Sequence, residues 1–436
     1  MEIRLRRHSR QFGSVLMITL VLAILLGTTL ASYLYWVRTQ NLLVMESQAW
    51  NSALAIAEAG VEEAMAQINI NVGGLNPLSY SSSISTNNWG AGPVYSKAGA
   101  LGYTVTISND SPPTIYSRGT NVVPLLGMPI SRTVVVKTTT NGLFGVGIAA
   151  IQNISMNGDN VYIDAYDSAD TNHFPGGLYN LANALPKGDV ASTTGFLNVK
   201  NADVHGRVIL SPNATYNVNS LNGLVGDMSW TGPGVQSPTS DWVITDFNKE
   251  FADVLEPYAG GLSTTGTGSG TNDYILGDGN YYYNGATFTV GNNKTLLVTG
   301  TAKLYVTGDF DGKANSEIKI LPGASLKLYV GTTAGSTVSA TFGQVNNLGN
   351  SFNFQVYGLP KCTSVTLGGN GQYVGTLYAP EANLSYNGGG VNTLDFQGAC
   401  VIYSADINGH FNLHYDINLA RTGPPSGYTL SSWQEL

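Results

Sequence analysis

A single uncharged stretch near the N-terminus constrains this chain more than any other feature. No charged residue stands between Arg10 and Arg38, and that run exceeds the roughly 20 apolar residues that a helix needs to cross a bilayer. Tyr and Trp side chains cluster at residues 33–36, where amphipathic rings settle at a membrane interface. The sequence therefore predicts a transmembrane helix over about residues 14–37.

The helical pattern continues past this segment to about Ile70. No Pro interrupts residues 14–70, and the second half is rich in Ala, Leu, Met, Glu and Gln, which favour helices. Small and apolar residues recur there at the three- and four-residue spacing of one helix face: Ala49, Ala53, Ile56, Ala57, Gly60, Ala64 and Ile68. We expect one helix over residues 14–70, roughly 85 Å long, with half in lipid and half outside it.

Two simpler interpretations of the N-terminus stay open. One is a cleaved signal peptide, although the apolar core of such a peptide is only about 7–15 residues long and ends at a small-residue cleavage site. The other is a plain membrane anchor with a helical stalk. Both would make the apolar segment a means of export or attachment and nothing more.

The same residues resemble those of a known family. A basic leader (Arg4, Arg6, Arg7 and Arg10), then Gly13 and a long apolar helix, is similar to the type III signal of type IV pilins and pseudopilins. The stretch ALAIAEAGVEEA at residues 53–64 further resembles PilX-like minor pilins. The resemblance implies that a prepilin peptidase cuts between Gly13 and Ser14 and that the helix then packs in a filament. Ile18 stands where major pilins carry Glu, which favours a minor subunit.

The composition favours an exported, mainly β protein. Only 11% of the 436 residues are charged, whereas Gly numbers 53 and Tyr 24, and a typical soluble domain has about a quarter of its residues charged. The formal net charge is −8. Because nucleic-acid binding needs a basic surface, we expect no nucleic-acid partner.

Beyond the helix, the chain divides into regions of different residue composition and pattern. Residues 71–142 combine a Gly- and Ser-rich linker with two alternating runs, at 103–107 and 133–138, that predict a small β module separated by a Pro-containing loop. From 143 to 420, short β-branched runs alternate with Gly corners, which favours a parallel β-helix-like solenoid over a sandwich. We expect an insertion at about 213–270 with a short amphipathic helix, and a capping or loose tail at 421–436.

Alternation of period two is clearest between residues 287 and 330. The residues expected to face inward there are Phe288, Val290, Leu296, Val298, Leu304, Val306, Ile318, Ile320, Leu326 and Leu328. Three C-terminal segments, at 354–360, 375–384 and 408–416, also resemble the β-helical heads of large PilX-type proteins. That head family implies no particular activity.

The chain has two cysteines, Cys362 and Cys400. In an exported domain a single pair is most simply one disulfide, which would stabilise the fold by about 3–4 kcal/mol in the chain-entropy model. Two buried free thiols are the alternative.

Several polar groupings suggest binding chemistry but favour structural roles. His410, His414 and Asp416 share a strand face and are conceivable metal ligands, although hydrogen bonds that close the last coil are the preferred explanation. Asp309, Asp311, Gly312, Asn315 and Glu317 weakly resemble a calcium-binding loop. The other two groupings are the acidic residues Asp159, Asp164, Asp167 and Asp170, whose spacing is also that of turn residues, and the tyrosines 281–283, which could stack on sugars. No catalytic, cofactor or metal site is assigned.

These observations predict a structural, non-enzymatic minor pilin-like subunit of a type IV pilus or related secretion filament, displaying its head for adhesion. Its expected partners are the bacterial inner membrane, a prepilin peptidase, other pilin-like subunits and surface glycans. The expected location is single-pass in the inner membrane with the head outside the cytoplasm, and on a surface filament after assembly. The alternative is a membrane-anchored carbohydrate-binding or carbohydrate-active β-helix protein.

Overall fold

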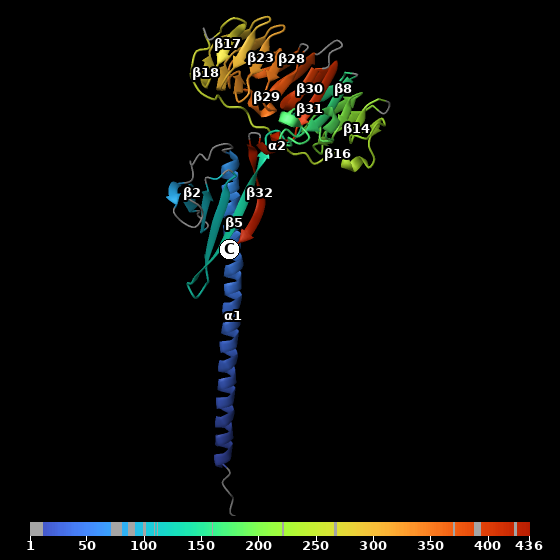
Figure 1. Cartoon of the computed structure of the whole chain (residues 1–436). Coiled ribbons are helices and arrows are strands. Elements are labelled where there is room, and N and C mark those ends of the chain that lie inside the picture. The colour runs from blue at the N-terminus through green and yellow to red at the C-terminus, as the bar shows by residue number, and fades with distance from the viewer. Residues whose placement is uncertain are drawn as a thin grey trace, which may run out of the picture. The chain divides into compact units, whose positions relative to one another are not determined.

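The computed structural model describes residues 12–70, 81–85, 92–98 and 102–436, apart from short gaps at 109, 111, 159, 220–221, 266–267, 369–370, 388–393 and 423–424. It divides into two compact units, Met1–Thr140 with Tyr428–Leu436, and Asn141–Gly427 (Figure 1). The predicted fold class is confirmed, because one long apolar helix is followed by a mainly β chain with a large domain of parallel strands.

Helix α1 runs without a break from Phe12 to Ile70. It is long and apolar enough to cross a membrane, and side chains from Val15 to Trp36 are exposed to the surroundings. Beyond this bare half, Ala49, Ala53, Ala57, Ala64 and Ile68 are fully buried. The predicted inward face is therefore confirmed, with Ile56 only half-buried at its margin.

A six-stranded sheet covers that face of the helix. Its order is β1-β2-β3-β4-β5-β32, and the pairs from β1 to β5 are antiparallel. The helix and sheet share a core of Ala57, Val61, Ala64, Ile68, Val105, Ile107, Ile115, Val134 and Val136. The strands are β1 (Ser81–Ser85), β2 (Gly92–Ala98), β3 (Tyr103–Ser108), β4 (Thr114–Val122), β5 (Pro129–Gly142) and β32 (Pro425–Glu435).

Two parts of this sheet differ from the sequence-based expectation. The segment expected as a Pro-containing loop holds β4, because Ile115 and Ser117 alternate inward onto the helix. The C-terminal residues are not a loose tail: β32 completes the sheet beside β5. Asn69 exchanges hydrogen bonds with the backbone of Tyr428, and Arg132 forms an ion pair with Glu435, so the end of the chain is fixed to the helix and the sheet.

The second unit is a coil of parallel strands. From β17 to β26 each strand pairs with the third strand along the chain, as β17 does with β20 and β20 with β23, so the chain makes one turn every three strands. The strands of its first part are β6 (Ile148–Ala150), β7 (Ile154–Met156), β8 (Asn160–Tyr166), β9 (Val190–Ser192), β10 (Phe196–Lys200), β11 (Asp203–His205), β12 (Val208–Leu210), β13 (Thr215–Val218), β14 (Leu224–Gly226), β15 (Gly234–Val235) and β16 (Val243–Ile244).

The second part begins at the opposite end of the same coil. Its elements are β17 (Asn272–Leu276), β18 (Gly279–Tyr283), β19 (Thr287–Val290), β20 (Thr295–Val298), β21 (Thr301–Val306), β22 (Asp309–Gly312), β23 (Glu317–Ile320), β24 (Ser325–Val330), β25 (Val338–Phe342), β26 (Gln344–Asn347), β27 (Phe354–Gly358), β28 (Cys362–Gly368), β29 (Tyr373–Asn387), β30 (Leu394–Asn408), β31 (His410–Asp416) and the short helix α2 (Leu419–Thr422). All ten residues expected to face inward between 287 and 330 are buried.

The two parts meet at a seam, defined here as the pairing of β30 and β31 with β6, β7 and β8. The last turn of the chain stacks in parallel register on the first, with β31 beside β8 over seven residue pairs. Residues about 250 positions apart in the sequence therefore become neighbours. The stack of strands is therefore continuous across the seam. Strands β13–β16 form one end of the coil and β17–β19 form the other.

The segment from Thr245 to Leu262, named here the strap, connects these two ends. The predicted amphipathic helix is wrong, since no helix forms at residues 245–260. The strap lies along successive turns, bonding in order to Leu210, Gly142, Tyr378, Thr333, Lys303 and Asn280. An extended chain advances about 3.3 Å per residue against 1.5 Å in a helix, so the extended form is the one that spans the coil.

The predicted disulfide is also absent, and Cys362 and Cys400 are buried free thiols. Cys362 begins β28, Cys400 lies in β30, and β29 runs between these two strands. Two strand spacings of about 4.8 Å exceed the roughly 7 Å between Cα atoms that a disulfide can bridge. Burial raises the pKa of each thiol to about 12.

Candidate functional site

The structure offers two candidate functional regions, the bare half of α1 and a groove at the seam. In the first, large apolar side chains surround the helix on every side, among them Leu16, Leu26 and Trp36. Gly13 lies in the first turn of α1, at the start of this half. Residues 1–11, with the basic leader, fall outside the described part of the chain, so the cleavage site at Gly13 and Ser14 stays a prediction.

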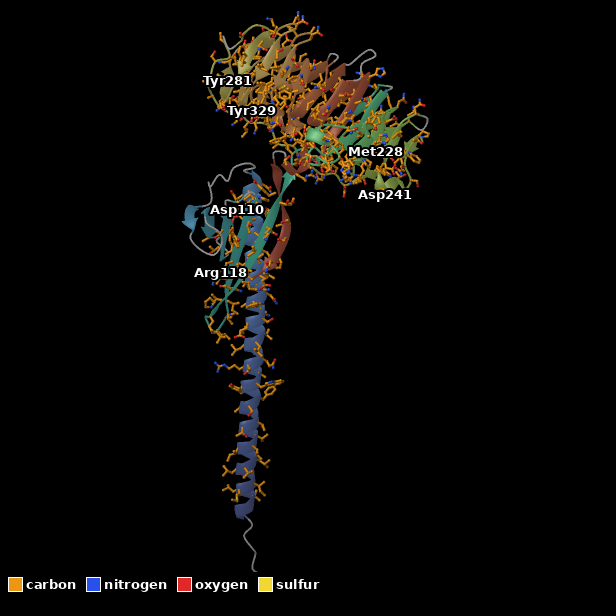
Figure 2. The ribbon with its side chains drawn as sticks, in the orientation of Figure 1. Asp110, Arg118, Met228, Asp241, Tyr281 and Tyr329 are labelled. Atoms are coloured by element: carbon orange, nitrogen blue, oxygen red, sulfur yellow. The ribbon has the colours of Figure 1, made fainter. Side chains whose placement is uncertain are left out.

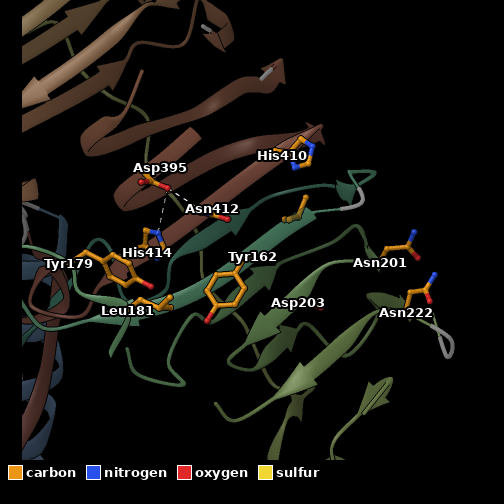
Figure 3. A pocket seen from close by; sticks show the side chains of 11 residues that line it. Tyr162, Tyr179, Leu181, Asn201, Asp203, Asn222, Asp395, His410, Asn412 and His414 are labelled. Carbon is orange, nitrogen blue, oxygen red and sulfur yellow. Dashed lines mark hydrogen bonds and ion pairs between the residues drawn. The ribbon is translucent and has the colours of Figure 1, made fainter. Parts of the chain in front are cut away.

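The groove has a volume of about 900 Å³ and lies across β31, β8 and β11 (Figure 3). The seam creates it, because β31 comes from the last turn of the chain and β8 from the first. Its described lining includes no Lys or Arg side chain and combines aromatic rings, amides and carboxylates. The lining residues are Val161, Tyr162, Tyr179, Leu181, Asn201, Asp203, Asn222, Asp395, His410, Asn412 and His414.

A His–Asp pair lies at one wall of the groove, with His414 in the lining and Asp164 fully buried. Nδ1 of His414 donates to Oδ1 of Asp164 at 2.5 Å, and the hydroxyl of Tyr179 donates to Oδ2 of the same carboxylate at 2.6 Å. The Tyr179 ring stacks on the imidazole with 3.5 Å between centroids. These contacts fix the orientation of His414, so that its Nε2 faces Asp395, with Oδ1 at 3.8 Å.

The environment moves the pKa values of this group in opposite directions. Burial pulls the pKa of His414 down, but hydrogen bonds to Asp164 and Asp395 outweigh it and hold the pKa above its ordinary value. The hydrogen bond from His414 lowers the pKa of Asp395 against the effect of burial. Across the groove, burial raises the pKa of Asp203. A separation of this kind between two carboxyl groups is found where proton donors and acceptors serve ligands.

The structure separates the residues that the sequence suggested as metal ligands. His410 and His414 line the groove, whereas Asp416 accepts hydrogen bonds from the backbone of Ser168 and the hydroxyl of Ser351. Within the described residues, no three His, Cys, Asp or Glu side chains are placed to hold a metal ion together.

The calcium-loop residues are engaged in separate local contacts. Asp309 accepts hydrogen bonds from Ser339, and Asp311 forms an ion pair with Lys313. Glu317 accepts a hydrogen bond from Asn346. Each of the three carboxylates therefore has a different protein partner.

The acidic group near residue 164 is also dispersed. Asp164 is buried at the groove, Asp167 pairs with Arg421 at 2.5 Å, and Asp170 pairs with the exposed ring of His173. Asp159 lies outside the described residues. Of the three described members, only Asp164 is associated with the groove, through its hydrogen bond with His414.

The consecutive tyrosines do not form an open stacking platform. Tyr281 is buried and its hydroxyl accepts from the backbone N–H of Gly277, whereas the Tyr283 hydroxyl donates to the carbonyl of Thr287. The groove instead uses Tyr162 and Tyr179, which sequence reasoning missed together with Asp203 and Asp395. The even spacing of His410, Asn412 and His414 could have indicated one wall of the groove. The opposite residues could not be found in this way, because β8 lies beside β31 only through the seam.

Comparisons with known proteins give limited matches. A family model described as Domain of unknown function (DUF7305) matches residues 234–422, from β15 to α2. No curated protein matches the chain. Among solved structures, the crystal structure of the competence-associated pilin ComZ from Thermus thermophilus is similar at 11% identity and a TM-score of 0.35, over 89% of this chain and 97% of that one.

Proposed function

We propose that this chain is a structural, non-enzymatic minor pilin-like subunit that is held in a membrane and then assembled into a filament through α1. The observation that carries the proposal is the division of one continuous helix. Its second half is covered by the chain's own six-stranded sheet, whereas its first half, from Val15 to Trp36, is apolar and bare. The resemblance of the leader and of residues 53–64 to type IV pilins supports the same conclusion.

The bare half needs a partner on physical grounds. Removing apolar surface from water stabilises by about 25 cal/mol per Å², and a helix of this length matches the hydrocarbon core of a bilayer. Lipid would cover it before assembly, and the helices of other subunits afterwards. A Cβ added at Gly27 would meet no other side chain or strand within 4 Å, and a small residue of this kind, with Ala31 one turn along, lets helix backbones approach closely.

The proposed assembly begins with cleavage between Gly13 and Ser14 by a prepilin peptidase. Gly13→Leu is expected to leave the chain in the membrane fraction of the source cells while removing it from sheared filaments. Gly145→Leu, at a head glycine with open space around it, is the matched control and should appear in both fractions. A Gly13→Leu chain that stays uncleaved and yet enters filaments would refute the proposal.

A second candidate function, ligand binding by the head, is favoured by the groove at the seam. Phenol rings, amides and carboxylates around a space of about 900 Å³ suit a polyhydroxylated ligand such as a surface glycan, because rings pack on apolar faces and polar side chains fix orientation. In this form α1 would act as a tether for an adhesive or carbohydrate-active head.

A glycan array probed with the full chain in detergent separates the two candidates. Binding that is lost in Tyr162→Ala and kept in Tyr216→Ala, a change at an exposed tyrosine outside the groove, would support a binding head. Release of sugar products would indicate an enzyme. Equal binding by both variants would show that the groove is not the binding site.

A further inference from the structure

The hairpin between β4 and β5 ends in an exposed apolar tip. The tip, defined here as residues 122–129, reads VVPLLGMP and contains no charged residue. Leu125 is 85% exposed, Met128 61% and Val122 51%. An isolated exposed apolar side chain is ordinary, but a contiguous group of them at the end of one loop indicates a contact surface.

The tip is a closed turn. The N–H of Val123 donates to the carbonyl of Met128 at 2.9 Å, and the N–H of Gly127 donates to the carbonyl of Val123 at 3.0 Å. Leu125 has a φ of 71°, a left-handed conformation that is rare for a bulky residue. Val123 is buried beneath the turn, so the exposed side chains stand outward on a fixed support.

Close contacts between β4 and α1 show the direction in which the tip points. A Cβ on Gly60 would meet the hydroxyl of Ser117, whereas a Cβ on Gly119 would meet the backbone of Ala53 and Ala57. Moving forward along β4 therefore means moving toward the N-terminus of α1. Figure 1 shows the hairpin running beside the helix in that direction.

The same contacts give the level of the tip along the helix. Val122 lies three residues beyond Gly119, which is about 10 Å of strand, and the turn adds roughly another 5 Å. At 1.5 Å per residue this corresponds to about ten helix residues, so the tip lies near the level of Leu43 and Val44. Those two side chains are also apolar and exposed.

That level coincides with the surface of the proposed membrane. Arg38 ends the uncharged segment and lies about 9 Å of helix below Val44, while the headgroup layer is about 5–7 Å thick on each side of the hydrocarbon. The apolar tip thus lies within a side chain's reach of the headgroups.

We propose that the tip of the β4–β5 hairpin binds the lipid interface of the membrane that α1 crosses, as a second contact that fixes the sheet against the bilayer before assembly. The proposal rests on membrane insertion of α1. The occupant of this surface is lipid, and a neighbouring subunit is the alternative that the test below separates.

An environment-sensitive fluorophore on the full chain tests the contact. Leu125→Cys is labelled with a nitrobenzoxadiazole maleimide, and the chain is placed in nanodiscs of phosphatidylcholine and phosphatidylglycerol at one chain per disc. The native thiols stay unlabelled because both are buried with raised pKa values. Met128→Cys is a second reporter, and Asp110→Cys, exposed on the same unit away from the tip (Figure 2), is the matched control.

We expect the Leu125 and Met128 labels to emit at shorter wavelength than the Asp110 label and to lose intensity when headgroup-spin-labelled lipid is included. Leu26→Cys, in the bare half of α1, reports insertion of the helix through lipid spin-labelled on the acyl chain. Quenching at Leu26 with none at Leu125 and Met128 would overturn the lipid contact and leave a neighbouring subunit as the occupant. No quenching at Leu26 would overturn the membrane insertion on which the inference rests.

Discussion

The contact between His414 and Asp164 joins the last turn of the coil to the first. Asp164 is fully buried and His414 nearly so, and they are 250 residues apart in the sequence. Burying two charges costs free energy that only good geometry and further hydrogen bonds offset. Tyr179 supplies such a hydrogen bond to Asp164, and Asp395 places a second carboxylate 3.8 Å from Nε2 of His414, so the pair stabilises the seam.

The pair predicts a pH dependence of head stability. A group whose pKa is raised by folding contributes stability that is complete below its unfolded pKa and is lost as the pH rises through its folded pKa. Because the pKa of His414 is raised, we expect the head to melt at a lower temperature at about pH 9 than at about pH 6. Thermal unfolding of the full chain in detergent measures this difference.

Two variants separate this effect from other titrating groups. Asp164→Asn should lower the melting temperature, because it removes one partner of a buried pair and costs about 3–5 kcal/mol, and should weaken the pH dependence. His173→Gln, which changes an exposed surface pair, should leave both unchanged. An undiminished pH dependence in Asp164→Asn would assign it to other residues.

Among elements, α1 and β4 are held at an unusually short separation. A Cβ on Gly119 would lie 2.1 Å from the carbonyl oxygen of Ala53 and 2.5 Å from the nitrogen of Ala57. These are backbone atoms of a helix and have little freedom to move. The absence of a side chain at Gly119 therefore sets how closely the sheet covers the helix.

Gly119→Ala should accordingly separate the sheet from the helix at a cost of about 1–3 kcal/mol. The measurement is hydrogen exchange of the backbone amides in β4 and in residues 49–68 of α1, which should lose protection. Gly145→Ala, at an open position, is the control. Unchanged protection in Gly119→Ala would show that the close approach has no energetic role.

The elements also show what local sequence can and cannot predict. The inward residues from Phe288 to Leu328 were predictable, because period two alone decides which side faces the core. The strap was not: Phe247, Phe251 and Val254 pack on the coil although Leu255, which completes the helical spacing, is exposed. Its course follows the successive turns that it contacts, from Leu210 to Asn280, and no local sequence pattern predicts those contacts.

At the scale of the whole molecule, the groove could not be predicted from the sequence, because it too depends on contacts between residues far apart along the chain. The even spacing of His410 and His414 indicated a shared strand face, and the structure confirms it on β31. The partners of His414, Asp164 and Tyr179, come from the first turn of the chain, which meets β31 through the seam. The long N-terminal helix, by contrast, needed only composition and spacing within 60 residues.

The central claim is that α1 is processed and assembled as a pilin helix. The most direct test is the N-terminus of the protein purified from its native membrane, determined by intact and peptide mass spectrometry. We predict a chain that begins at Ser14, cut after Gly13. A chain that retains Met1 would make α1 a permanent anchor, and a cut near Ala31 would make it a signal peptide; either result would contradict the filament account.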